Sequence, residues 1–155
     1  MPQLKKFKTE NEFCRYFKKE YCLREVETFD GIRVYFREKR FNHAFYESSK
    51  KDGGKGAFSL VRAQRVDWIR ITLESSKSEM FQGWDSAKKR YDPCRRVSVL
   101  YEDFIVVIEM RLKKTGELKA EFITCFQADN SIEKIRRSPK RTKQRCLEVL
   151  KKKGR

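Results

Sequence analysis

His43 is the only histidine of the chain, and it is the one side chain expected to titrate near neutral pH. It lies in a basic stretch, after Lys39 and Arg40 and before Lys55. Nearby cations and burial disfavour the protonated ring, and the neutral imidazole is the form that a general base requires. A lone histidine on a helix is more often a surface or structural residue, so His43 is a candidate catalytic group with a structural alternative.

Two arginines come next, Arg62 and Arg65, in a segment that predicts one helix over residues 58–74. On such a helix Arg62 lies at the centre of an apolar stripe whose residues fall within about 40° of one direction, and Arg65 lies about 60° to one side. The stripe consists of Phe58, Val66, Ile69 and Leu73. An arginine there must be neutralised or must face an opening. Either Arg62 pairs with a buried carboxylate such as Glu109 or Glu121, or the helix borders a cleft where both arginines bind phosphate.

Thr124 and Phe126 lie in the last predicted strand, where alternate residues should share one face of a sheet. That face would carry Leu118, Ala120, Phe122, Thr124 and Phe126. A threonine between two phenylalanines is ordinary core material. It also suits a nucleotide pocket, where a ring stacks on a base and a hydroxyl binds a phosphate oxygen. We weigh these two interpretations equally.

Other chemistries find little support in the sequence. The five cysteines form no CxxC pair and only one histidine is present, so a zinc site is excluded, and a disulfide framework is not expected. The spacing does not support a nucleophilic pair of Cys125 with His43. The carboxylates are dispersed, which argues against a two-metal nuclease. We therefore expect no metal and no cofactor.

The charge of the chain points to a polyanionic partner. Its 155 residues carry a formal net charge of +16, and its 13% aromatic content argues against disorder. Residues 131–155 hold eleven Lys and Arg against two Glu. We expect residues 140–155 to form a basic tail whose Lys140, Arg141 and Lys143 bind nucleic acid. Binding to a membrane surface is less favoured, because the apolar stripe of this tail is thin.

The predicted elements give an α+β fold of one domain, residues 1–139, followed by the tail. Helices are expected first, over residues 9–74, with a capping box at Thr9–Glu12, a strand at 32–36 and a flexible loop at 48–57. A roughly four-stranded antiparallel sheet should follow over 80–126, and a short helix over 130–137. The expected segments are helices at 9–21, 37–48 and 58–74, strands at 80–84, 96–101, 104–112 and 117–126, and a polar connection at 84–94. With no apolar leader and no membrane-length run, we expect a cytoplasmic protein.

Several motifs together resemble the barnase–EndoU–colicin–RelE-like nuclease superfamily, in particular its phage and prophage branch. They are His43 on an early helix, the Arg62-Ala63-x-Arg65 motif, the strand motif Phe122-x-Thr124-x-Phe126, and a closing Ile-x-x-Ile-Arg segment before Pro139. The resemblance covers roughly residues 33–139. It implies helices packed on an antiparallel sheet, in an endoribonuclease that works without metal.

The resemblance also implies roles for particular residues. In this superfamily the ribose 2′-OH attacks the adjacent phosphorus and leaves a 2′,3′-cyclic phosphate. His43 would then act as base or acid, Arg62 and Arg65 would clamp the phosphate, Thr124 would donate to it, and Phe126 would stack on a base. There is no second histidine, so Lys55 or an arginine would have to be its partner, and which group is acid stays open.

The partners implied by the resemblance are RNA, such as tRNA or another structured RNA, and a cognate inhibitor or antitoxin protein. Members are commonly toxins or host-directed effectors. The competing hypothesis is a non-catalytic RNA- or DNA-binding module that uses a basic cleft and the tail. Arg62 discriminates between the two, because a simple binder needs no arginine within an apolar stripe.

Overall fold

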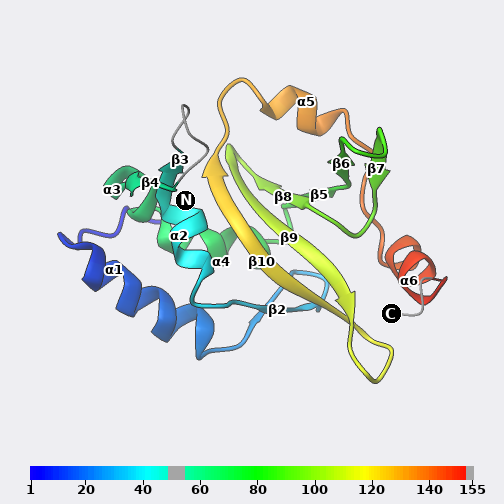
Figure 1. Ribbon diagram of the computed structural model, residues 1–155, viewed down its shortest axis with the longest axis horizontal. Helices are drawn as coiled ribbons and strands as arrows, with labels where there is room; N and C mark the ends of the chain where they lie inside the picture. The colour runs from blue at the N-terminus through cyan, green and yellow to red at the C-terminus, as the bar shows by residue number, and fades with distance from the viewer. Residues whose placement is uncertain (49–54, 153–155) are drawn as a thin grey trace.

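A six-stranded mixed sheet forms the centre of the computed structural model, which describes residues 1–48 and 55–152 (Figure 1). The strand order is β1-β2-β10-β9-β8-β5. The strands are β1 (Val26–Glu27), β2 (Arg33–Tyr35), β5 (Glu79–Phe81), β8 (Val97–Tyr101), β9 (Phe104–Leu112) and β10 (Leu118–Gln127). The α+β class is confirmed. The predicted sheet of roughly four antiparallel strands was too small. Strand β2 pairs with β10 in parallel, and β1 pairs with β2, so these two strands extend the sheet.

The long strands match the sequence pattern closely. β8, β9 and β10 form an antiparallel meander, as the period-two pattern predicts. In β9 every residue from Phe104 to Ile108 is buried, so both faces of the sheet are covered there. A strand buried on both sides is typically a continuous apolar run, and this one reads FIVVI.

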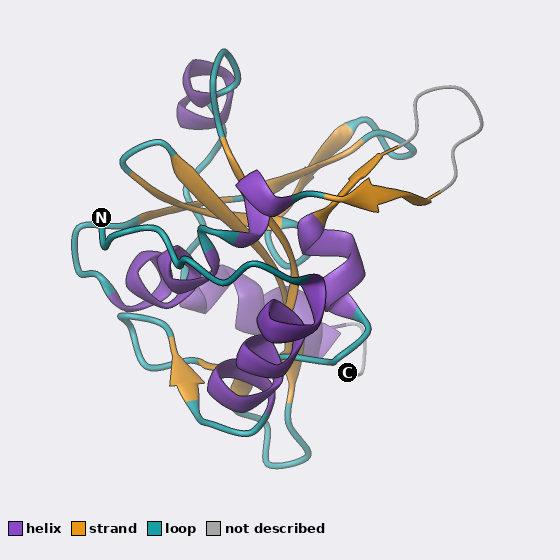
Figure 2. Ribbon diagram, turned by 90° about the vertical axis from the view of Figure 1, so that its left-hand side faces the viewer, coloured by secondary structure: helices purple, strands orange, loops and turns teal. Residues whose placement is uncertain are grey.

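Helices cover one face of this sheet (Figures 1 and 2). They are α1 (Glu10–Phe17), which continues into the π-helix η1 (Lys18–Cys22), α2 (Arg40–Phe45) and α4 (Val66–Glu74). The predicted capping box is confirmed, since Thr9 and Glu12 bond each other's backbone N–H groups. Helix and sheet bury a common core rich in phenylalanine, which includes Phe13, Phe17, Phe45 and Phe122.

The single helix predicted over residues 58–74 is wrong. Phe58 ends strand β4 (Lys55–Phe58), which pairs with β3 (Tyr46–Ser48), and the helical part divides into α3 (Leu60–Ala63) and α4. Ser59 begins α3, because its hydroxyl accepts the Arg62 backbone N–H. The helix predicted over 37–48 shortens to α2 for the same reason, since β3 takes residues 46–48. Most of the loop predicted at 48–57 lies outside the described residues.

The other face of the sheet carries a smaller apolar cluster. Its buried members are Phe81, Leu100, Ile105, Val107 and Ala128. Helix α5 (Ile132–Arg136) packs there through Ile132 and Ile135, and it confirms the short helix predicted at 130–137. The predicted polar connection at 84–94 contains a hairpin of β6 (Gly83–Asp85) and β7 (Arg90–Asp92).

The C-terminal residues are part of the folded domain. Helix α6 (Lys143–Lys152) buries Cys146 and Leu150 in the main core, and Lys140 forms a β-bridge with Phe81. The expected boundary between residues 139 and 140 is therefore wrong, because packing continues across it. Within the described part of the chain, each helix is too short or too polar to cross a bilayer.

Candidate functional site

The predicted site residues meet where helix α2 contacts strand β10. The Thr124 hydroxyl donates to the His43 backbone carbonyl at 3.2 Å. The Arg62 guanidinium donates from Nε to the Ala44 carbonyl at 2.9 Å and from Nη2 to the Cys125 carbonyl at 3.0 Å. Three segments far apart in the sequence are thus tied together by hydrogen bonds.

Arg62 forms no ion pair with the carboxylates considered for it. Glu109 pairs with Arg95 and Arg111, and Glu121 pairs with Arg37 and Arg111. Backbone carbonyls satisfy the half-buried guanidinium instead, so the ion-pair alternative is wrong. Across the described residues Nη1 of Arg62 has no hydrogen-bond partner. Arg62 is a fixed cation with one nitrogen available for a ligand.

Arg65 occupies the break between α3 and α4. It holds the N-cap position of α4 without a side-chain capping bond, and its Nη1 donates to the Val61 carbonyl. Its guanidinium carbon lies over the Trp68 ring, 5.1 Å from the ring centre. Its Nε is buried without a hydrogen-bond partner in the part of the chain that the structure describes. Stacking on an aromatic ring leaves the edge of a guanidinium free to bind a planar anion.

Arg62, Arg65 and Phe126 line one small pocket of about 140 Å³. Its wall includes Cys125, and burial raises the pKa of that thiol to about 12. Cys125 therefore stays protonated at neutral pH and has no thiolate with which to act as a nucleophile. The pocket joins two predicted phosphate ligands to the predicted stacking residue.

Phe126 reaches this pocket because β10 is irregular. The pairing with β9 shifts register between Phe122 and Thr124. Beyond this bulge Cys125 faces the main core with Phe122, whereas Phe126 joins the smaller cluster on the opposite face. The expectation that Phe122, Thr124 and Phe126 share one face is wrong, because the extra residue of a bulge exchanges the faces.

His43 is exposed on the last turn of α2, and its backbone is held by Thr124. The Thr124 hydroxyl proton is used in this hydrogen bond, so Thr124 positions His43 in this structure rather than presenting a donor to phosphate. The side chain of Lys55 lies outside the described residues. Only its backbone, the first residue of β4, is placed.

Arg141 of the predicted tail is a structural residue. Its side chain is 3% exposed and pairs with Asp30 at 2.6 Å, so it is unavailable to nucleic acid, contrary to expectation. Burial acts to raise the pKa of Asp30, but hydrogen bonds from Thr28 and Arg141 outweigh it and hold the pKa below its usual value. Lys143 is exposed but donates to the Asp30 carbonyl, and Lys140 pairs with Glu79 at 3.3 Å.

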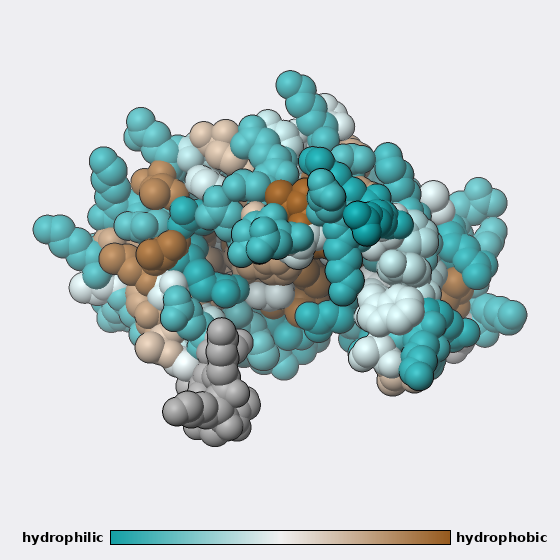
Figure 3. Space-filling model, turned by 90° about the horizontal axis from the view of Figure 1, so that it is seen from above, coloured by the Kyte–Doolittle hydropathy of each residue, from teal (hydrophilic) through white to brown (hydrophobic). Residues whose placement is uncertain are grey.

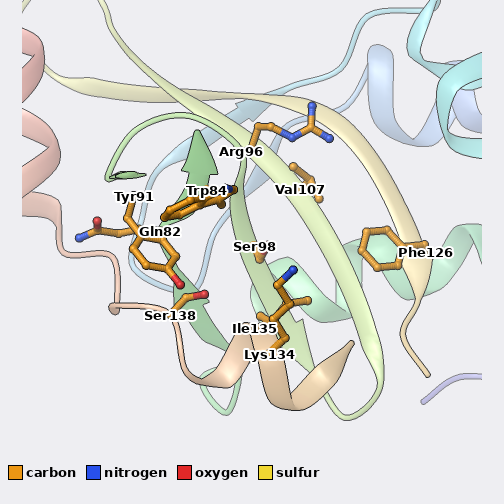
Figure 4. A pocket seen from close by; sticks show the side chains of 11 residues that line it. Gln82, Trp84, Tyr91, Arg96, Ser98, Val107, Phe126, Lys134, Ile135 and Ser138 are labelled. Atoms are coloured by element: carbon orange, nitrogen blue, oxygen red, sulfur yellow. The ribbon is translucent and has the colours of Figure 1, made fainter. Parts of the chain in front are cut away.

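A larger pocket lies on the face opposite the main helical layer, and the sequence interpretation missed it. It encloses about 620 Å³ between the β6–β7 hairpin, helix α5 and the central strands. Figure 4 shows Trp84 and Tyr91 together at one end, Phe126 at the other, and Lys134 between them. The available indication was an aromatic residue at each end of the basic stretch WDSAKKRY.

The described residues contain no group of three or more His, Cys, Asp or Glu side chains arranged to hold a metal ion. The candidate site therefore consists of one imidazole, fixed guanidinium groups and aromatic rings around two pockets that share Phe126. No protein-family model matches the chain, and no curated protein or solved structure shows significant similarity to it.

Proposed function

We propose that the protein is an endoribonuclease that cleaves RNA by attack of the ribose 2′-OH on the neighbouring phosphorus, without a metal ion. One observation carries the proposal: residues selected from three separate stretches of sequence meet at one junction. The Thr124 hydroxyl donates to the backbone carbonyl of His43, and Arg62, Arg65 and Phe126 line one nearby pocket.

Each group has a task in this reaction. The scissile phosphate lies against Arg62 and Arg65, and the unpaired Nη1 of Arg62 donates to the oxygens that gain charge in the phosphorane. Because two carbonyls hold Arg62, the donor is already oriented before substrate binds. His43 transfers a proton, either from the 2′-OH or to the departing 5′-oxygen. Thr124 positions His43 through its backbone.

The experiment is incubation of the purified protein with RNA in EDTA, followed by analysis of the new ends. We expect fragments that end in a 2′,3′-cyclic phosphate, and no cleavage where a 2′-deoxy nucleotide precedes the scissile bond. His43→Ala should lose about 10²- to 10⁴-fold in rate. Asn42→Ala is the matched control, because Asn42 is exposed on the same helix and touches neither pocket.

Cleavage that requires magnesium, or that survives in His43→Ala, would contradict the proposal. The second candidate is a non-catalytic RNA- or DNA-binding module. A specific observation favours it: donors of Arg62 and Thr124 are already bound to backbone carbonyls, as in a purely structural role. Tight RNA binding with no cleavage under any condition would select this candidate.

A further inference from the structure

We propose that the larger pocket binds the bases of single-stranded RNA next to the cleavage site, with Trp84 and Tyr91 as the stacking platform. The inference rests on the proposed function and deepens it, because it names the form of the substrate and a second binding site for it. Four features of the pocket lead to this conclusion.

The first feature is an exposed aromatic pair. Trp84 and Tyr91 are register partners in the β6–β7 hairpin, 52% and 37% exposed, and their rings lie edge to face with centres 5.1 Å apart. Single exposed apolar side chains are common on protein surfaces and need no explanation. Two large rings side by side at the mouth of a 620 Å³ pocket are a more specific arrangement, since a pocket of this volume holds a small ligand.

The second feature is charge. Arg96 and Lys134 line the pocket, no carboxylate does, and neither cation forms an ion pair within the described residues. The nearest acidic side chains of the hairpin are turned to its own backbone: Asp85 accepts from the amides of Ala87 and Lys88, and Asp92 from those of Cys94 and Arg95. In the view from above, apolar side chains lie in a hollow framed by hydrophilic ones (Figure 3).

The third feature is that the backbone fixes this arrangement. Arg96 has a left-handed backbone with φ of 51°, which is unfavourable for a residue with a side chain. Gly83 packs directly against it, since a Cβ at position 83 would lie 2.3 Å from the Arg95 carbonyl oxygen and 2.6 Å from that of Arg96. The hairpin with its aromatic pair is therefore held against the segment that carries Arg96.

The fourth feature is a residue shared with the smaller pocket. Phe126 lines both the larger pocket and the pocket of Arg62 and Arg65. A ligand that fills both must be elongated, must present planar groups to Trp84 and Phe126, and must carry anionic groups to the arginines and Lys134. A single strand of RNA has this pattern, because its unpaired bases can stack while its phosphates meet cations. A duplex keeps its bases stacked on one another and cannot use the aromatic pair.

The test measures binding of a labelled 2′-O-methyl uridine 10-mer by fluorescence anisotropy. This probe has no free 2′-OH and cannot be cleaved, so its binding does not depend on the proposed catalysis. We expect Trp84→Ala to weaken binding about 5- to 150-fold and Trp84→Phe to retain most of it. Lys134→Met should lower the slope of log affinity against log salt by about 0.7. Leu23→Ala is the control, an exposed apolar residue that lines neither pocket.

A second measurement protects the test against a variant that folds poorly. The chain has two tryptophans, and Trp68 is half-buried against Phe104, so stacking on Trp84 should quench wild-type fluorescence and leave Trp84→Phe unchanged. Unchanged affinity in Trp84→Ala, or equal affinity for the same probe in a duplex, would overturn the inference. Loss of cleavage in EDTA with binding intact would overturn the proposed function alone.

Discussion

Arg62→Met tests whether the guanidinium that joins α2 to β10 stabilises the fold, the catalytic step or both. Methionine keeps most of the apolar stem and removes the two hydrogen bonds to the Ala44 and Cys125 carbonyls. Hydrogen bonds that involve a charged group contribute about 1.5–3 kcal/mol each, so the upper limit is about 3–6 kcal/mol. Because Arg62 is only half-buried, water can bond the two carbonyls in the variant and offset part of this loss. We therefore expect the free energy of unfolding to fall by about 2–4 kcal/mol.

The assay is thermal unfolding, followed by cleavage measured well below the melting temperature. For a chain of this size each kcal/mol lowers Tm by about 2–4 °C, so Arg62→Met should melt about 4–16 °C below the wild type. The cleavage rate per folded molecule should fall about a hundredfold or more, because the free Nη1 no longer stabilises the phosphorane. Leu60→Ala is the neighbouring control, since Leu60 is exposed and lines neither pocket.

The two readouts are independent. An unchanged Tm would refute the structural argument, because it would mean that the two carbonyl contacts add nothing to stability. A lower Tm with full activity per folded molecule would refute the catalytic role and leave Arg62 as a structural cross-link.

Three further predictions concern other parts of the molecule. Folding lowers the pKa of Asp30, so the stability that its carboxylate contributes should be present above about pH 4 and be lost as the pH falls through the folded-state pKa. Urea unfolding should therefore show that the difference in unfolding free energy between wild type and Asp30→Asn shrinks below about pH 4. A difference that stays constant with pH would contradict this prediction. Gly83→Ala should displace the hairpin and weaken binding of the 10-mer as Trp84→Ala does, whereas the exposed Ser86→Ala should bind normally. In cleavage of RNA, Trp84→Ala should raise KM about 5- to 150-fold with little change in kcat, and an equal fall in kcat would place Trp84 at the reacting phosphate instead.

The sequence was sufficient for elements with long, regular patterns. The strands at 96–101, 104–112 and 117–126 and the capping box at Thr9 follow from local periodicity and local hydrogen bonding, and all of them are present. Their patterns do not depend on the rest of the fold.

The errors arose where distant contacts overrule local preference. Phe58 has helical spacing from Val66, but the pairing of β4 with β3 places it in a strand. The bulge in β10 leaves no mark in a period-two pattern, and it moved Phe126 to the other face of the sheet. Arg141 has the composition of a basic tail, and only its proximity to Asp30, 111 positions earlier, makes it structural.

The candidate site was predicted by residue type better than by geometry. His43, Arg62, Arg65 and Thr124 were identified from the sequence, and their backbones or side chains meet. Their detailed roles depend on which donors the backbone already uses, which no spacing reveals. The Trp84–Tyr91 pair was missed because two three-residue strands are too short to show periodicity.

The parallel pairing of β2 with β10 has a consequence for synthesis on the ribosome. Val34 pairs with Ala120, which is made 86 positions later. At about 5–20 residues per second, the paired residue of β10 is synthesised about 4–17 s after Val34 of β2. During this time β2 and the phenylalanine-rich helices beside it lack the strand that β2 pairs with. Helix α6 is made later still and buries Cys146 and Leu150 in the main core, so the core of the nascent chain stays incomplete until residues 143–152 have left the exit tunnel. Chains cut short by a premature stop codon after Pro139 lack this last layer, and they should be removed by proteolysis rather than accumulate as a folded, partly active protein.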